Sequence, residues 1–194
     1  MTNTPLGILL KEVQECHHCE AHLPLGPRPV VQAEYSARLL IIGQAPGTRV
    51  HETGIPWNDP SGDRLREWLQ MDKERFYDPA QVAIMPMGFC YPGRGNSGDL
   101  PPRPECAPKW HAAIKSHLPN VELTLLIGDY AQRYYLEGKP KTLTETVKAN
   151  ANWSPDFIAL PHPSPRNNLW LRKNPWFEAE ILPILRKSTD QLFS

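Results

Sequence analysis

Two nearly continuous apolar runs, each closed by a glycine, constrain the fold of this chain more than any other feature. Residues 37–42 read ARLLII and end at Gly43, and residues 121–127 read VELTLLI and end at Gly128. Runs of this kind are typical of strands buried on both faces, as in a parallel sheet covered by helices. Residues 82–87 and 157–160 are shorter candidates for two further strands.

Helical patterns lie between these runs. Ser61 is placed to cap a helix in which Leu65, Trp68 and Leu69 share one face. Further helices are expected at residues 8–13, 110–118, 129–136 and 177–185, the last of them bent or divided by Pro183. Residues 92–108 are expected to be irregular, because prolines cluster there.

Strands that alternate with helices predict an α/β fold. We expect three α/β/α layers around a central, mostly parallel, four-stranded sheet. With 194 residues and no visible internal boundary, the chain is expected to form a single domain over residues 1–194.

Charge and hydropathy limit the partners and the location of the protein. The chain has 21 basic and 21 acidic residues, which argues against strong non-specific binding to nucleic acid. Charge is local, however, because residues 160–173 contain Arg166, Arg172 and Lys173 and no acid. No apolar run approaches the roughly 20 residues that span a bilayer, and residues 1–11 lack the features of a signal peptide. We therefore expect a cytoplasmic protein that does not bind membranes.

The four cysteines of the chain are Cys16, Cys19, Cys90 and Cys106. In a reducing compartment such cysteines are metal ligands or free thiols more often than disulfides. A Cys-x-x-Cys turn joined by a second pair suits zinc or an iron–sulfur cluster, and the spacing does not choose between them. The alternative is that Cys90 and Cys106 are ordinary buried residues and that His17 or His18 completes a poorer site.

Two polar motifs follow strands of the expected sheet. Gly43-Gln44-Ala45-Pro46-Gly47 follows the first apolar run, and His162-Pro163-Ser164-Pro165-Arg166-Asn167 follows the last strand. Ligands of parallel sheets bind beyond the carboxyl ends of the strands, so a site is expected between these loops. Ser164 and Arg166 have the chemistry to contact phosphate. The alternatives without a functional role are an ordinary turn for the first motif and a solvated surface loop for the second.

The segment TGIPWNDPSG, residues 53–62, places an aromatic and a carboxylate just before a helix start. Taken alone, Asp59 is a turn former or an acid at a helix N-terminus. Trp57 alone would be a core residue.

Together, GQAPG and HPSPRN resemble the uracil-DNA glycosylase superfamily, and the cysteine arrangement resembles its iron–sulfur branch, often called family 4. The resemblance runs from about Glu12 to Arg186 and includes TGIPW and LLIGDYA. It implies a DNA glycosylase that hydrolyses the N-glycosidic bond of uracil, or of a related deaminated base, in DNA during base excision repair. It also implies that the four cysteines hold a [4Fe–4S] cluster, with structural zinc as the alternative. The expected partner is DNA containing the damaged base, and the expected state is a monomer.

The resemblance implies a role for each motif. His162 would donate a hydrogen bond to the uracil O2 as negative charge develops there, and Trp57 would stack on the base after it leaves the helix. One wall of the base pocket would be formed by the first motif, Gly43, Gln44, Ala45, Pro46 and Gly47. The tip that enters the vacated stack would be formed by Ser164, Pro165, Arg166 and Asn167.

The chain departs from the family pattern in the first motif and at the base-reading position. Gln44 stands where the iron–sulfur branch has glutamate, and Ala45 stands where other branches have aspartate or asparagine. Residues 84–89 contain no asparagine to read the uracil edge. Asp59 resembles an aspartate of the family 5 enzymes and would orient water or stabilise the sugar cation.

These departures leave two other hypotheses open. One is a catalytically weak or inactive module that binds DNA or nucleotides on the same fold. The other is a zinc-stapled enzyme that acts on a free nucleotide or another small molecule.

Overall fold

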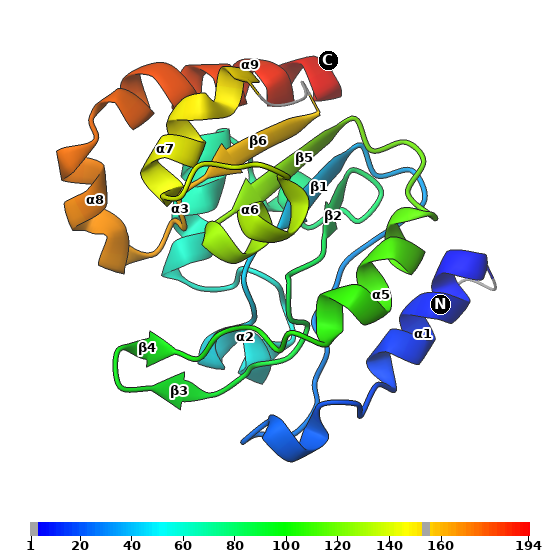
Figure 1. Ribbon diagram of the computed structural model, residues 1–194. Coiled ribbons are helices and arrows are strands. Elements are labelled where there is room, and N and C mark those ends of the chain that lie inside the picture. Colours follow the sequence, from blue (N-terminus) through cyan, green and yellow to red (C-terminus); the bar gives the residue numbers. More distant parts are fainter. Residues whose placement is uncertain (1–3, 153–155) are drawn as a thin grey trace.

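The computed structural model describes residues 4–152 and 156–194, and within them a four-stranded parallel sheet forms the centre of the molecule (Figure 1). Its strands are β1 (Leu39–Ile42), β2 (Val82–Ile84), β5 (Leu123–Ile127) and β6 (Phe157–Leu160), in the order β2-β1-β5-β6. Leu40 of β1 pairs with Ala83 on one side and Thr124 on the other. The expected strands are therefore confirmed, although β2 ends at Ile84.

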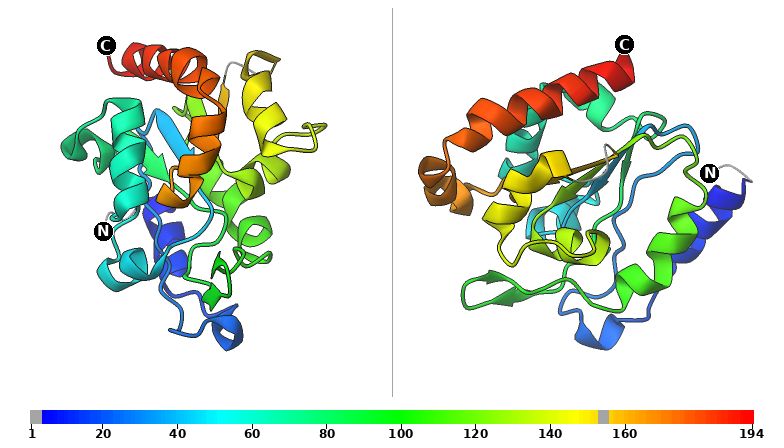
Figure 2. Two further views of the ribbon diagram at one scale, coloured as in Figure 1. Left: turned by 90° about the vertical axis from the view of Figure 1, so that its left-hand side faces the viewer. Right: turned by 45° about the horizontal axis from the view of Figure 1, so that its top comes forward.

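Alternate residues of each strand face opposite layers, and both faces are covered. Leu39, Ile41 and Leu125 belong to a core packed against α3 (Pro60–Leu69), α4 (Lys73–Phe76), α7 (Leu143–Lys148) and α9 (Leu182–Phe193). Leu40 and Leu126 belong to a second core packed against α1 (Pro5–Gln14), α5 (Cys106–Lys115) and α6 (Asp129–Tyr135). Figures 1 and 2 show α9 and α1 on opposite sides of the sheet. The three-layer α/β/α prediction is confirmed.

The remaining helical segments are short. They are α2 (Thr48–Thr53), α8 (Asn168–Lys173), the 3-10 turns η1 (Glu20–His22), η2 (Ala149–Asn152) and η3 (Pro165–Asn167), and the π-helical turn η4 (Phe177–Ile181). The C-terminal helix is divided as expected, since η4 gives way to α9 with Pro183 in its first turn, but α9 continues to Phe193. None of the helices in the described parts of the chain is long and apolar enough to cross a membrane.

The expectation that Ser61 caps α3 is wrong. Pro60 occupies the first turn, where its missing N–H costs nothing, and the Oδ1 of Asp59 accepts a hydrogen bond from the Gly62 N–H at 2.8 Å. Ser61 consequently lies inside the first turn. Because Asp59 rather than Ser61 is the cap, a carboxylate stands at the loop that enters the helix.

A short hairpin replaces part of the segment that was expected to be irregular. Its strands are β3 (Arg94–Gly95) and β4 (Gly98–Asp99), and they pair antiparallel. Figure 1 shows the hairpin extending from the body of the molecule on the side away from α9. Cys90 and Cys106 lie on either side of it in the sequence.

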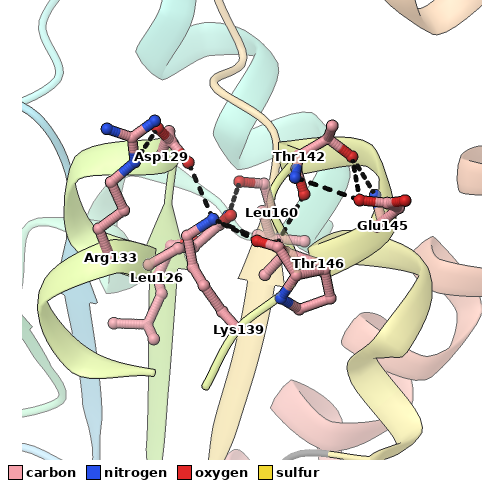
Figure 3. A network of polar contacts seen from close by, with 10 residues as sticks. Leu126, Asp129, Arg133, Lys139, Thr142, Glu145, Thr146 and Leu160 are labelled. Carbon is pink, nitrogen blue, oxygen red and sulfur yellow. Dashed lines mark hydrogen bonds and ion pairs between the residues drawn. The ribbon is translucent and has the colours of Figure 1, made fainter. Parts of the chain in front are cut away.

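Buried polar contacts fix the carboxyl ends of β5 and β6 next to each other. The Gln132 side chain donates hydrogen bonds to the carbonyl oxygens of Leu126 and Leu160, at 3.1 and 2.9 Å. Beside it, Lys139 forms an ion pair with Asp129 at 3.2 Å, which holds the loop between α6 and α7 to the same edge (Figure 3). The loop that carries His162 leaves the sheet from this braced edge.

Candidate functional site

The two polar motifs line one cavity of about 430 Å³ beyond the carboxyl ends of the strands. The first motif contributes all of its residues, Gly43, Gln44, Ala45, Pro46 and Gly47. The second contributes His162, Ser164, Arg166 and Asn167, and the intervening loop contributes Trp57 and Asp59. Pro165 is the exception among the predicted residues, since it lies in η3 and does not line the cavity.

Trp57 is held against the first motif in a backbone conformation that is rare for a residue with a side chain. Its φ angle is 55°, in the left-handed region. A Cβ atom on Gly43 would lie 2.7 Å from the indole Cζ2, and a Cβ atom on Gly62 would overlap the Trp57 carbonyl. Both positions therefore require glycine for the ring to occupy this place.

Two side chains that the sequence analysis did not single out hold the Trp57 carbonyl. The guanidinium of Arg66 and the hydroxyl of Tyr77 each donate to this oxygen at 3.4 Å. Arg66 is buried on α3, donates to Asp63 at 2.6 Å and lies over the ring of Phe76. A strained backbone that several groups hold in place is common at functional sites. No sequence signal identifies Arg66, because an arginine three residues after an aspartate has the pattern of an exposed helical ion pair.

His162 faces Trp57, with 5.6 Å between the ring centroids and 35° between the ring planes. The Ser164 N–H donates to His162 Nδ1 at 3.2 Å, and the Asn167 side chain donates to the His162 carbonyl at 2.7 Å. Burial lowers the pKa of His162 to about 4, and the neighbouring Asp59 charge only partly opposes this effect. The imidazole is therefore neutral at pH 7. Because Nδ1 accepts a hydrogen bond, the proton resides on Nε2, which is left to donate to a ligand.

Asp59 serves α3 and the cavity together. Its Oδ1 caps the helix, which confirms the interpretation of this residue as an acid at a helix N-terminus. Its side chain also lines the pocket. Its charge acts on the His162 imidazole. The helix-capping role accordingly fixes a carboxylate near the imidazole.

The hairpin forms a wall of the cavity that the sequence analysis missed. Ser97, Gly98 and Asp99 of this segment line the pocket. The guanidinium of Arg166 occupies the space where a side chain on Gly98 would lie, so the hairpin and the second motif contact each other directly. Strands of two residues are too short to show a hydrophobic period, so no sequence pattern predicted the hairpin.

All four cysteines line a second, smaller cavity, together with Phe89, Trp110 and other residues. Burial raises the pKa of the Cys90 thiol to about 11 and that of Cys106 to about 12. Cys106 Sγ accepts a hydrogen bond from the Phe89 N–H at 3.3 Å. Cysteines that are distant in the sequence thus line the same cavity.

The donor set of this smaller cavity is sulfur. Across residues 4–152 and 156–194, no three histidine, cysteine or acidic side chains group closely enough to hold a single metal ion. His17 contacts Glu20 at the surface, and neither His17 nor His18 is among the residues that line the cavity. Four thiols around an apolar cavity fit the ligand chemistry of an iron–sulfur cluster.

Known proteins resemble this chain over most of its length. Residues 30–186 match the sequence model of the uracil DNA glycosylase superfamily. The chain is also 24% identical over 161 residues to the type-4 uracil-DNA glycosylase of Thermotoga maritima, covering 82% of this chain and 81% of that protein. The residues that match the family include both polar motifs.

Replacing Gly62 by alanine is expected to destabilise the protein by about 1–3 kcal/mol, because the new methyl group would overlap the Trp57 carbonyl. Urea unfolding followed by tryptophan fluorescence measures the change. The matched control is Gly47→Ala, whose added methyl would meet nothing closer than 3.5 Å. Equal stability of the two variants would contradict the described position of Trp57.

The His162 imidazole is expected to stay neutral until the pH falls to about 4, because its enclosure disfavours the charged form. Nitrogen-15 NMR of the ring should show the Nε2–H tautomer at pH 7. A titration midpoint at the ordinary value of about 6.5 would contradict the assignment.

Proposed function

This chain belongs to the uracil-DNA glycosylase superfamily, and we propose that it is a DNA glycosylase that hydrolyses the N-glycosidic bond of uracil, or of a related deaminated base, in DNA. The observation that carries the proposal is the meeting of the GQAPG and HPSPRN loops at one cavity, with a neutral histidine opposite a tryptophan. Removal of such a base is the first step of base excision repair.

The cavity suits a single nucleobase that has left the double helix. A base inside the stack cannot be reached at its glycosidic bond, so enzymes of this kind extrude the nucleotide into a pocket. The Trp57 indole offers a face on which the base can stack, and the backbone from Gly43 to Gly47 forms the adjoining wall.

His162 would act on the charge that develops as the bond breaks. Cleavage leaves the bonding electron pair on the base, so that negative charge accumulates at its carbonyl oxygen. A neutral imidazole whose Nε2–H donates to that oxygen stabilises the departing anion. One aimed donor of this type is worth roughly 3–4 kcal/mol of the barrier. Asp59 would support the positive charge that develops on the sugar.

The second motif would contact the nucleic acid beside the base. Arg64 of α3 donates to the Ser164 carbonyl at 3.2 Å, which fixes the loop from a rigid helix. Ser164, Pro165, Arg166 and Asn167 would form the tip that occupies the vacated stack. Arg172 and Lys173, which follow at the end of α8, add positive charge for the phosphates.

Cys16, Cys19, Cys90 and Cys106 would hold a [4Fe–4S] cluster. When bound, the cluster supplies folding energy and joins the segment after α1 to both ends of the 90–106 segment. The cysteines must stay reduced to bind a cluster, and the cytoplasm is a reducing compartment. We therefore propose that the protein acts in the cytoplasm, as a monomer.

Purified protein is expected to release free uracil from a uracil-containing oligonucleotide. His162→Ala should slow single-turnover release by about 100-fold or more, because the donor to the leaving base is lost. His117→Ala, in the turn that follows α5 and outside the cavity lining, is the control and should keep the parental rate. A His162→Ala variant as fast as the parent would refute the assigned donor. Salt-dependent binding of damaged DNA without release of uracil, hypoxanthine or xanthine would instead indicate the inactive binding module.

Cys106→Ser is expected to lower the melting temperature by at least about 5 °C, because a structural cluster contributes to folding. The rate of base release per folded molecule should change little. Iron analysis and the visible absorbance of the parent protein identify the group. Colourless parent protein with stoichiometric zinc, or a variant with unchanged stability, would contradict the cluster.

A further inference from the structure

Hydrolysis of a glycosidic bond needs a water molecule as the nucleophile, and the first motif of this chain has no group to activate it. Gln44 and Ala45 have no basic side chain at neutral pH. Among the described residues, the carboxylates that line the cavity are those of Asp59 and Asp99. On the basis of the proposed function, one of these two carboxylates acts on the water.

Asp59 is constrained by its role as the N-cap of α3. Its Oδ1 accepts the Gly62 N–H at 2.8 Å and caps α3, so one of its carboxylate oxygens is engaged inside the protein. Its charge acts on His162, next to which the base would lie. This carboxylate is well placed to stabilise charge but is not free to reorient with a water molecule.

The Asp99 side chain has no structural role of this kind. Within residues 4–152 and 156–194, its side chain makes no hydrogen bond or ion pair, and it is exposed on β4 at the cavity. An unpaired carboxylate at a surface that must approach DNA phosphates opposes binding by like-charge repulsion. A negative charge there does not add to the affinity for DNA, and the unpaired carboxylate is available for the chemical step.

The position of Asp99 matches the sugar end of an extruded nucleotide. Trp57 covers the beginning of the first motif at Gly43, whereas Asp99 lies at its far end, where a Cβ atom on Gly47 would be 3.5 Å from Asp99 Oδ2. Because Trp57 covers the Gly43 end of the motif, a base stacked on it leaves the Gly47 end of the cavity, beside Asp99, for the sugar. Arg166 packs into the space beside Gly98, which fixes the hairpin that carries Asp99 to the second motif.

We propose that Asp99 is the catalytic carboxylate that orients and deprotonates the hydrolytic water. The bond from the water oxygen to the sugar C1′ forms as the bond from C1′ to the base nitrogen breaks. The electron pair of the broken bond departs with the base, whose anion His162 stabilises. The water proton passes to Asp99 and then to solvent.

The test compares Asp99→Ala, Asp99→Asn and Asp59→Asn under single-turnover conditions on a uracil oligonucleotide. Asp72→Asn is the control, since Asp72 caps α4 away from the cavity and asparagine also caps helices. Both Asp99 variants are expected to release uracil about 100-fold more slowly or worse, the usual contribution of a positioned base. Added formate should restore part of the rate of Asp99→Ala, because a small carboxylate can enter the vacated space.

Binding to an oligonucleotide that carries 2′-fluoro-2′-deoxyuridine, which resists cleavage, separates chemistry from structure. Asp99→Asn should bind it as tightly as the parent or more tightly, because a repulsive charge is removed. Binding that weakens as much as the rate would overturn the proposal in favour of a structural role. A parental rate in Asp99→Asn, or a loss confined to Asp59→Asn, would also overturn it while the proposed function stands. A parent that releases no base would remove the proposed function itself, and the role of Asp99 with it.

Discussion

The parallel pairing of β1, β5 and β6 is the constraint on which the site depends. In a parallel sheet every strand delivers its following loop to the same edge, so Gly47 and His162, far apart in the sequence, are brought to one cavity. The pairing is continuous from Ile42 through Leu126 to Ala159, and Gln132 ties the carbonyls of neighbouring strands together at that edge. The loops at this edge can be irregular because the regular sheet holds their ends in place.

Much of this arrangement could be predicted from the sequence, because burial on both faces leaves a direct trace. Strands such as LLII carry apolar residues at successive positions, and glycine marks their ends. The features that were not predicted depend on competition between two possible caps or on contacts between residues that are not neighbours in the sequence. Asp59 and Ser61 are both good caps, and Pro60 between them decides in favour of Asp59. Arg66 is buried because distant Tyr77 and Phe76 surround it, and no local pattern records that.

The smaller cavity is linked to the larger one through the chain itself. Cys90 and Cys106 lie at either end of the segment that carries the hairpin, and the hairpin forms a wall of the large cavity. Buried thiols with raised pKa values stay protonated at neutral pH unless a cationic group binds them, so deprotonation and ligand binding are coupled there. A group bound by the four sulfurs would fix both ends of the hairpin segment and thereby limit how far its wall can move.

The electrostatics of the large cavity divide into two parts that suit opposite charges. A neutral imidazole next to Trp57 offers an Nε2–H donor without carrying a positive charge. The exposed Asp99 contributes negative charge at the other end of the first motif. The transition state of a reaction that separates an anionic base from a cationic sugar is stabilised when a hydrogen-bond donor and a carboxylate already flank it, because no reorganisation is needed as the bond breaks. The absence of a carboxylate at Gln44 and Ala45 is therefore compatible with catalysis, since the required negative charge can come from a different loop.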